Sequence, residues 1–325
     1  MITLQQVEAA ATRLANVSVR TPLLQSAALD SAVGGDVLVK PECLQVTGSF
    51  KIRGAYNFLS QLNAEEAQCG VVAFSSGNHA QGVAAAGAML GIRTAIVMPE
   101  DAPRAKLENT RRLGGEVITY DRYTGDRETI ARELAAQRGS VVVPSYDHDY
   151  IIAGQGTVGL EIAEQCAEMG VEPDQTLVCC GGGGLIAGSA TALKAHFPDA
   201  AVHAVEPEDF DDTARSLRSG KRQRCDESAR SICDALQAPT PGKLTFAINQ
   251  QLLDEGLVVS DAEVRAAMRF AFANLKLVVE PGGAVALAAA LAGRVDTRGR
   301  TTVIVLSGGN VDSDLFSSIQ REASG

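Results

Sequence analysis

Tryptophan is absent from the 325 residues of the chain, and aromatic residues make up only 4 % of it. Side chains on which nucleic-acid bases stack are therefore scarce. The formal net charge of −10 opposes a phosphate backbone, and no long run of lysine and arginine offsets it. We therefore expect no nucleic-acid partner.

Cysteine is not arranged in pairs. The seven cysteines are an odd number, and no C-x-x-C motif occurs. This usage favours reduced thiols and a cytoplasmic location over a disulfide framework or a zinc site. No apolar run approaches the roughly 18 residues that a membrane span needs, and the first residues lack the basic start and apolar block of a signal peptide. The sequence thus predicts a cytoplasmic protein without a membrane partner.

What is present is an ordinary globular mixture, with 46 % apolar and 21 % charged residues. Apolar, β-branched runs alternate with helical patterns, which predicts an α/β fold of parallel sheets covered by helices. The number of strands indicates two sheets and two lobes. We expect a large domain formed by residues 1–69 and 144–325, with a small domain, 70–143, inserted into it. The predicted strands are 37–40, 71–74, 94–98, 117–120, 141–143, 176–180, 201–205 and 302–306, and the predicted helices include 79–90, 104–113, 127–138, 156–169 and 185–196.

Glycine clusters at two places. The stretch 154–159 reads GQGTVG and matches G-x-G-x-x-G, the pattern of dinucleotide-binding turns. That pattern requires a strand directly before it, whereas the segment PSYDHDY intervenes here. A nicotinamide site and a helix start packed closely through small residues are the two alternatives, and the spacing favours the second.

The second cluster follows a predicted strand at once: TLVCC is followed by GGGG at 181–184 and then by a helical pattern. Successive backbone N–H groups at a helix N-terminus favour a phosphate group. A tight turn is the alternative, although a turn does not require four glycines.

A lysine, Lys51, follows Gly-Ser-Phe where another helix is predicted to begin. It is either an exposed lysine or an activated amine. Together with a phosphate loop, the second possibility indicates pyridoxal phosphate, whose aldehyde forms a Schiff base with an amine.

Five motifs occur in order: TGSFKIRGA at 47–55, SSGNHAQGVA at 75–84, AGQGT at 153–157, GGGGL at 181–185 and LSGGN at 306–310. Together they resemble the fold-type II pyridoxal-phosphate enzymes, which have the tryptophan synthase β-like fold. The resemblance spans nearly the whole chain and includes serine racemases, 3-hydroxyaspartate dehydratases and serine-threonine dehydratases. The regulatory domain that continues the biosynthetic threonine dehydratases is not expected here.

The resemblance implies a role for each motif. Lys51 would be the Schiff-base lysine and general base, with Phe50 packed beside the cofactor. Asn78 would bind the cofactor's phenolic oxygen, Gly181, Gly182, Gly183 and Gly184 its phosphate, and Ser307 its pyridine nitrogen. A hydroxyl partner leaves that nitrogen largely unprotonated, which favours elimination. The substrate α-carboxylate would bind the turn formed by Ser75, Ser76, Gly77, Asn78 and His79.

Three further features indicate which branch of this family the chain resembles. Ser76 stands where threonine dehydratases usually have alanine. It would reprotonate the face opposite Lys51, unless it only binds carboxylate or fills space. Glu206, the Phe210 carbonyl and Asp212 resemble the Mg²⁺ or Mn²⁺ site of the racemase branch, with an acidic surface loop as the alternative. Arg127 would bind a second substrate carboxylate, unless it is a solvated arginine at a helix start.

The expected function is therefore that of a pyridoxal-phosphate-dependent ammonia-lyase, or dehydratase. Its substrate would be a β-hydroxy amino acid, namely 3-hydroxyaspartate, serine or threonine. The products of α,β-elimination are a 2-oxo or imino acid, water and ammonia. Serine racemisation with side elimination is the alternative, and the loop at 237–242 departs from the serine-bearing loop of the racemases. A non-catalytic pyridoxal-phosphate carrier is a third possibility. We expect a homodimer, as is common among such enzymes.

Overall fold

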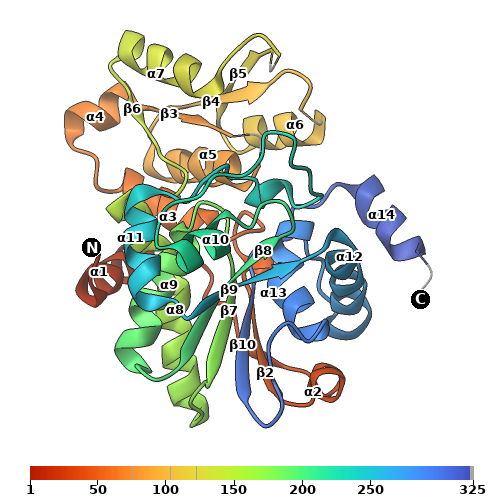
Figure 1. Ribbon diagram of the computed structural model, residues 1–325. Helices are drawn as coiled ribbons and strands as arrows, with labels where there is room; N and C mark the ends of the chain where they lie inside the picture. The colour runs from red at the N-terminus through yellow and green to blue at the C-terminus, as the bar shows by residue number, and fades with distance from the viewer. Residues whose placement is uncertain (76, 103, 122, 323–325) are drawn as a thin grey trace.

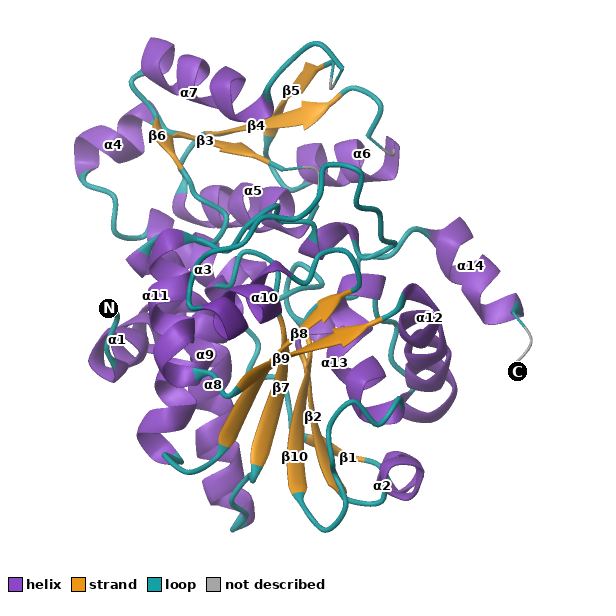
Figure 2. Ribbon diagram, viewed as in Figure 1, coloured by secondary structure: helices purple, strands orange, loops and turns teal. Residues whose placement is uncertain are grey.

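The computed structural model describes residues 1–75, 77–102, 104–121 and 123–322. Its strands form two separate sheets, which lie one above the other in Figures 1 and 2. Both sheets are covered by helices, as the sequence pattern predicts, so the predicted α/β class is confirmed. Within the described ranges, no helix is both long enough and apolar enough to cross a membrane.

The larger sheet has six strands in the order β1-β2-β10-β7-β8-β9. Only β1 runs antiparallel to its neighbour, and the remaining pairs are parallel. Parallel strands buried on both faces require near-continuous apolar runs, and TTVIVL in the central β10 is one. The strand bounds are β1 Leu24–Gln25, β2 Asp36–Pro41, β7 Gln175–Cys179, β8 Ala201–Pro207, β9 Glu255–Val259 and β10 Thr301–Leu306.

Helices pack on this sheet from two sides (Figure 1). One helix, α13, contacts β7, β8, β9 and β10, whereas α8 and α9 pack together with α9 against β7. All of these elements contribute to one apolar core. The bounds are α1 Leu4–Leu14, α2 Ala27–Val33, α3 Lys51–Leu59, α8 Asp149–Met169, α9 Gly184–His196, α10 Asp212–Ser219, α11 Lys243–Leu252, α12 Asp261–Phe270, α13 Pro281–Leu291 and α14 Ser313–Arg321, with short 3₁₀ turns at Glu42–Leu44 and Asp234–Leu236 and a π-helical turn at Ala271–Leu275.

The smaller sheet has four parallel strands in the order β5-β4-β3-β6. Alternate residues of β3 point to opposite faces: Val71 and Ala73 join the core under α5, whereas Val72 joins the core under α7. The bounds are α4 Ala64–Cys69, β3 Val71–Phe74, α5 Asn78–Leu90, β4 Thr94–Pro99, α6 Arg104–Arg112, β5 Glu116–Tyr120, α7 Arg127–Arg138 and β6 Val141–Val142. The division into domains at 69/70 and 143/144 stays a prediction.

All eight predicted strands are present, to within two residues at either end. Two expectations need correction. The structure adds β1 and β9 at the edges of the larger sheet. The helix expected from residue 156 already begins at Asp149, because the His148 side chain accepts a hydrogen bond from the Tyr150 N–H and caps it. The G-x-G-x-x-G stretch is therefore in the interior of α8 and not at its start.

Candidate active site

Lys51 is the first residue of α3, and Phe50 occupies the N-cap position. The Lys51 ammonium lies 5.2 Å from the centre of the Phe50 ring and donates a hydrogen bond of 3.0 Å to the Ser145 carbonyl oxygen. Burial lowers the pKa of Lys51 to about 8, although Cys179 and Glu280 act in the opposite direction. A larger fraction of this amine is neutral at physiological pH than that of an exposed lysine.

Glycines allow two helices to approach α3 closely. A Cβ at Gly82 on α5 would lie 3.1 Å from the Lys51 carbonyl carbon, and one at Gly154 on α8 would lie 2.7 Å from the Arg53 carbonyl oxygen. The distance at Gly154 leaves no room for a Cβ, and the distance at Gly82 is tighter than most side-chain contacts. Within AGQGT, Gly154 therefore serves the packing of α8 against the lysine-bearing helix. The structure supports the close-packing alternative and places no strand-to-helix turn here.

The loop after β3 leads directly into α5. The Ser75 hydroxyl accepts a hydrogen bond of 3.1 Å from the Gly77 N–H, and Asn78 and His79 begin the helix as buried residues. Burial lowers the pKa of His79 to about 3, so the neutral ring donates to the Val143 carbonyl oxygen at 3.2 Å. Ser76, the predicted second proton donor, lies outside the described residues.

The Asn78 amide is held on both sides. Its Nδ2 donates to Glu280 Oε1 at 2.5 Å, and its Oδ1 accepts from Asn310 Nδ2 at 2.7 Å. Asn310 Nδ2 also donates to the Thr47 carbonyl oxygen at 2.8 Å. Three of the five motifs therefore meet around one amide, and its orientation leaves one further N–H for another acceptor.

Ser307 follows the last residue of β10 and is buried. Its carbonyl oxygen accepts a hydrogen bond of 3.1 Å from the Phe50 N–H, and the Gly48 carbonyl accepts one of 2.8 Å from the Gly309 N–H. The Ser307 side chain also acts on the Cys179 thiol, where it opposes the rise in pKa that burial causes. The LSGGN loop is thus joined by its backbone to the turn that precedes Lys51.

The tetraglycine loop connects β7 to α9, as predicted. In the part of the chain that the structure describes, the backbone N–H groups of Gly181–Gly184 have no hydrogen-bond acceptor. Four successive free donors at a helix N-terminus match a phosphate group in number and charge.

Arg127 is the first residue of α7 and is exposed. Its guanidinium lies 6.0 Å from the centre of the Phe74 ring. Since Phe74 is the last residue of β3, it directly precedes the loop that starts at Ser75. The structure therefore brings Arg127 next to the strand that carries this loop, although contact with a substrate stays a prediction.

Glu206 and Asp212 are both buried. The Glu206 carboxylate accepts hydrogen bonds from the N–H groups of Thr213 and Ala214, at 2.9 and 2.7 Å. Asp212 Oδ1 accepts one of 3.1 Å from the Cys225 thiol, whereas Asp212 Oδ2 is buried without a partner. Burial raises the pKa of both carboxyls, that of Asp212 to about 6.

These two carboxylates fit a cation, because one buried oxygen lacks a partner. The third predicted ligand, the Phe210 carbonyl, belongs to a residue that is also buried. No group of three or more His, Cys, Asp or Glu side chains among the described residues is arranged to hold a metal ion. Both carboxylates are nevertheless buried, whereas an acidic surface loop would expose them.

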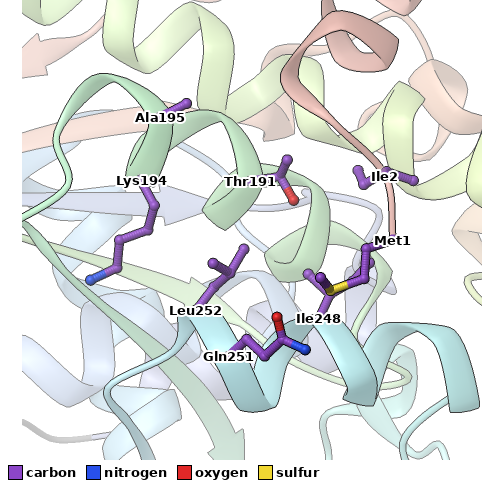
Figure 3. A pocket seen from close by; sticks show the side chains of 8 residues that line it. All are labelled: Met1, Ile2, Thr191, Lys194, Ala195, Ile248, Gln251 and Leu252. Carbon is purple, nitrogen blue, oxygen red and sulfur yellow. The ribbon is translucent and has the colours of Figure 1, made fainter.

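A cavity of about 280 Å³ lies elsewhere, between α9, α11 and the N-terminus. Figure 3 shows Met1 and Ile2 on one side of it and Ile248 and Leu252 on α11. None of the predicted site residues lines this cavity. The candidate active site is therefore a different place, where the motif loops meet.

Sequence reasoning missed three contacts of the site. Ser145 supplies the oxygen that binds Lys51, Glu280 orients Asn78, and Asp147 binds the first turn of α11. Asp147 and Ser145 lie in the segment that separated the G-x-G-x-x-G stretch from its strand. Glu280 is 202 residues from its partner, and no local pattern marks it.

Comparison with known proteins gives consistent results. A family model described as "Pyridoxal-phosphate dependent enzyme" matches residues 15–308. An L-threo-3-hydroxyaspartate ammonia-lyase from Pseudomonas sp. is 44 % identical, over 96 % of both chains. A serine racemase from Schizosaccharomyces pombe is 40 % identical, over 97 % of this chain and 96 % of the relative. The solved structure of maize serine racemase has a TM-score of 0.91 at 38 % identity and covers 98 % of this chain and 96 % of that one.

Proposed function

This chain belongs to the family of pyridoxal-phosphate dependent enzymes, and from that premise we propose that it is an ammonia-lyase. It converts a β-hydroxy amino acid, either 3-hydroxyaspartate, serine or threonine, to a 2-oxo or imino acid, water and ammonia. The observation that carries this proposal is a buried lysine with a lowered pKa, placed in one site with a loop of free backbone donors.

The residues present fit the cofactor. The free N–H groups of Gly181–Gly184 would bind its phosphate, Lys51 would hold its aldehyde, and Phe50 would pack beside it. Asn78, already fixed by Glu280, would bind its phenolic oxygen through the remaining amide N–H. When bound, pyridoxal phosphate supplies an electron-withdrawing ring that acidifies the α-carbon of the substrate.

Lys51 also transfers the proton. With substrate and cofactor bound, the Lys51 amine would remove the α-proton as general base. A pKa of about 8 suits this task near neutral pH. Ser307 would face the ring nitrogen with a hydroxyl and not with a carboxylate. That choice limits the electron withdrawal by the ring and favours departure of the β-hydroxyl over a long-lived carbanion.

Substrate recognition uses the two ends of the β3–α5 connection. Ser75, Gly77 and His79 lie around the loop that receives the α-carboxylate, together with Asn78. Arg127, which rests on Phe74, provides the cation for a second carboxylate. This arrangement favours 3-hydroxyaspartate among the three substrates, and the Pseudomonas relative carries that substrate in its name.

Racemisation is the second candidate. It is supported by the 40 % identity to the serine racemase from Schizosaccharomyces pombe and by a serine at position 76, which would reprotonate the opposite face of the α-carbon. In this role Ser76→Ala lowers racemisation more than elimination.

A divalent cation, Mg²⁺ or Mn²⁺, belongs to the same proposal. Glu206, Asp212 and the carbonyl of Phe210 would bind it, since Asp212 Oδ2 is buried without a partner. Calorimetric titration with Mg²⁺ and Mn²⁺ tests this cation site, and Asp212→Asn should abolish binding.

We also propose a cytoplasmic homodimer, with a small domain of residues 70–143 inserted into a large one.

The decisive experiment combines a visible spectrum with product analysis. The purified protein is incubated with 3-hydroxyaspartate, serine and threonine, with and without Mg²⁺, and both 2-oxo acid release and enantiomer composition are measured. We expect oxo acid release as the main activity, and loss of both turnover and the visible absorbance of the bound cofactor in Lys51→Ala. Racemisation that exceeds elimination would favour the second candidate. Absence of any turnover would leave only a carrier function.

A further inference from the structure

The tetraglycine loop is enclosed by neighbouring residues. A Cβ at Gly182 would lie 2.3 Å from the ring of Tyr146, and one at Gly183 would lie 2.8 Å from Asn249 Nδ2 and 3.0 Å from Thr245 Oγ1. Gly183 also has a φ of +92°, a left-handed conformation that favours glycine. The glycines are thus required by packing as well as by the need for free N–H groups.

The carbonyl of Gly182 is the point where α11 holds this loop. It accepts a hydrogen bond of 2.7 Å from Thr245 Oγ1 and one of 3.2 Å from the Gly242 N–H. Gly242 is the N-cap residue of α11, and Thr245 lies in its first turn. Because a peptide is planar, a fixed Gly182 carbonyl also fixes the Gly183 N–H, which belongs to the same peptide. The first turn of α11 therefore controls the direction of this loop donor.

That first turn is capped by a residue from a different part of the chain. Gly242 has no side chain to cap the helix. The Asp147 carboxylate instead accepts hydrogen bonds from the N–H groups of Lys243, Leu244 and Thr245, at 2.9, 2.9 and 3.2 Å. It satisfies donors that a helix N-terminus leaves without partners.

Asp147 belongs to a short segment that contacts both Lys51 and the tetraglycine loop. The Ser145 carbonyl binds Lys51 Nζ at 3.0 Å, the Tyr146 ring packs on Gly182, and Asp147 binds α11. Three consecutive residues between β6 and α8 thus reach the covalent anchor, the phosphate loop and the helix that supports the loop.

We propose that Asp147 is a positioning residue for the cofactor phosphate: by capping α11 it holds the Gly182 carbonyl and so aims the Gly183 N–H, which lies in the same peptide. The inference rests on the proposed function only for the identity of the ligand. The negative charge of Asp147 opposes a phosphate dianion, so its contribution comes from the cap and not from its charge. Asp147 Oδ1 accepts from the Leu244 and Thr245 N–H groups and Oδ2 accepts from Lys243. Asparagine keeps one acceptor oxygen, enough for two of these bonds, whereas alanine keeps none. Asparagine therefore removes the charge and retains most of the cap, and alanine removes both.

The experiment uses the apo-protein, titrated with pyridoxal 5′-phosphate, and measures the dissociation constant by absorbance. The ³¹P chemical shift of the bound phosphate is recorded alongside. We expect Asp147→Ala to raise the dissociation constant about fivefold, on the order of the effect of losing one helix cap. Asp147→Asn should raise it less than alanine does, because its amide oxygen still accepts from two of the three N–H groups.

Asp312→Ala is the matched control, because Asp312 caps α14 through two backbone N–H groups. It should leave the dissociation constant unchanged. If Asp147→Ala does not yield folded protein, Thr245→Val removes the donor to the Gly182 carbonyl with the cap intact, and it should raise the dissociation constant in the same direction.

The inference is overturned if folded Asp147→Ala or Thr245→Val binds the cofactor with wild-type affinity and an unchanged ³¹P shift. It is also overturned if asparagine and alanine tighten binding equally, since charge would then dominate. Failure of the wild type itself to bind the cofactor would instead contradict the proposed function.

Discussion

The pH dependence of stability should depend on Glu280. This residue precedes α13, is only 4 % exposed and binds the Asn78 amide. Burial raises its pKa to about 7 from an ordinary value of 4.5, and the charge of Asp234 adds to the effect. Asn78, Lys106 and Lys51 act in the opposite direction without cancelling it. Glu280→Gln replaces the carboxyl with a neutral group of the same shape.

The sign follows from proton binding. Between pH 4.5 and 7 the folded protein holds a proton on Glu280 that the unfolded chain has released. Stability therefore falls as pH rises through this window. With about 1.36 kcal/mol for each pKa unit, the whole loss amounts to roughly 3 kcal/mol by pH 8. Below pH 4.5 the protonated Glu280 and a glutamine at this position should be nearly equivalent.

The assay is urea denaturation of the apo-protein at pH 4.5 and pH 8. The free energy of unfolding of Glu280→Gln should exceed that of the wild type by roughly 3 kcal/mol more at pH 8 than at pH 4.5. Groups common to both proteins cancel in this difference. Glu8→Gln, at an exposed position on α1, controls for the substitution. A difference between Glu280→Gln and wild type that is constant with pH would refute the reasoning.

Three further changes follow from the site. Because burial lowers the pKa of Lys51 to about 8, the rate of cofactor attachment to the apo-protein should rise with pH and level off near 8; a rise that continued to pH 10 would indicate an exposed amine. Asn249 is fully buried with both amide atoms unpartnered, so Asn249→Leu should raise the free energy of unfolding of the apo-protein by about 1–3 kcal/mol in urea denaturation, and a loss would mean that the amide has a partner. Gly82→Ala places a Cβ 3.1 Å from the Lys51 carbonyl carbon and should cost about 1–3 kcal/mol of stability and lower kcat, whereas unchanged kinetics would show that α5 does not fix Lys51.

The fold was predictable where strands are buried on both sides. The central strands read as continuous apolar runs, such as TLVC within β7 and TTVIVL in β10, and the order of strand and helix indicates parallel sheets. The edge strands were not predictable in this way. Strand β1 has only two residues, and β9 begins with Glu255 and Gly256 and is only partly buried.

The candidate site was also predictable only in part. Motif residues such as Lys51 and the glycines at 181–184 lie at element boundaries that sequence patterns mark, and the structure brings these loops together. Their chemical roles stay predictions. Glu280 and Asp147 act across 202 and up to 98 residues of chain. Such contacts depend on how complete elements pack, so no local pattern encodes them.

A cluster of four charges anchors the helix that begins at Lys51. Arg53, two residues after Lys51, binds Glu42 at 2.8 Å and Glu161 at 2.7 Å, and Lys40 binds Glu161 at 2.6 Å. Buried charges are costly unless they are paired, and these two cations and two carboxylates balance. Neither Glu42 nor Glu161 is among the groups that raise the pKa of Lys51. The cluster therefore anchors α3 without stabilising the charged amine.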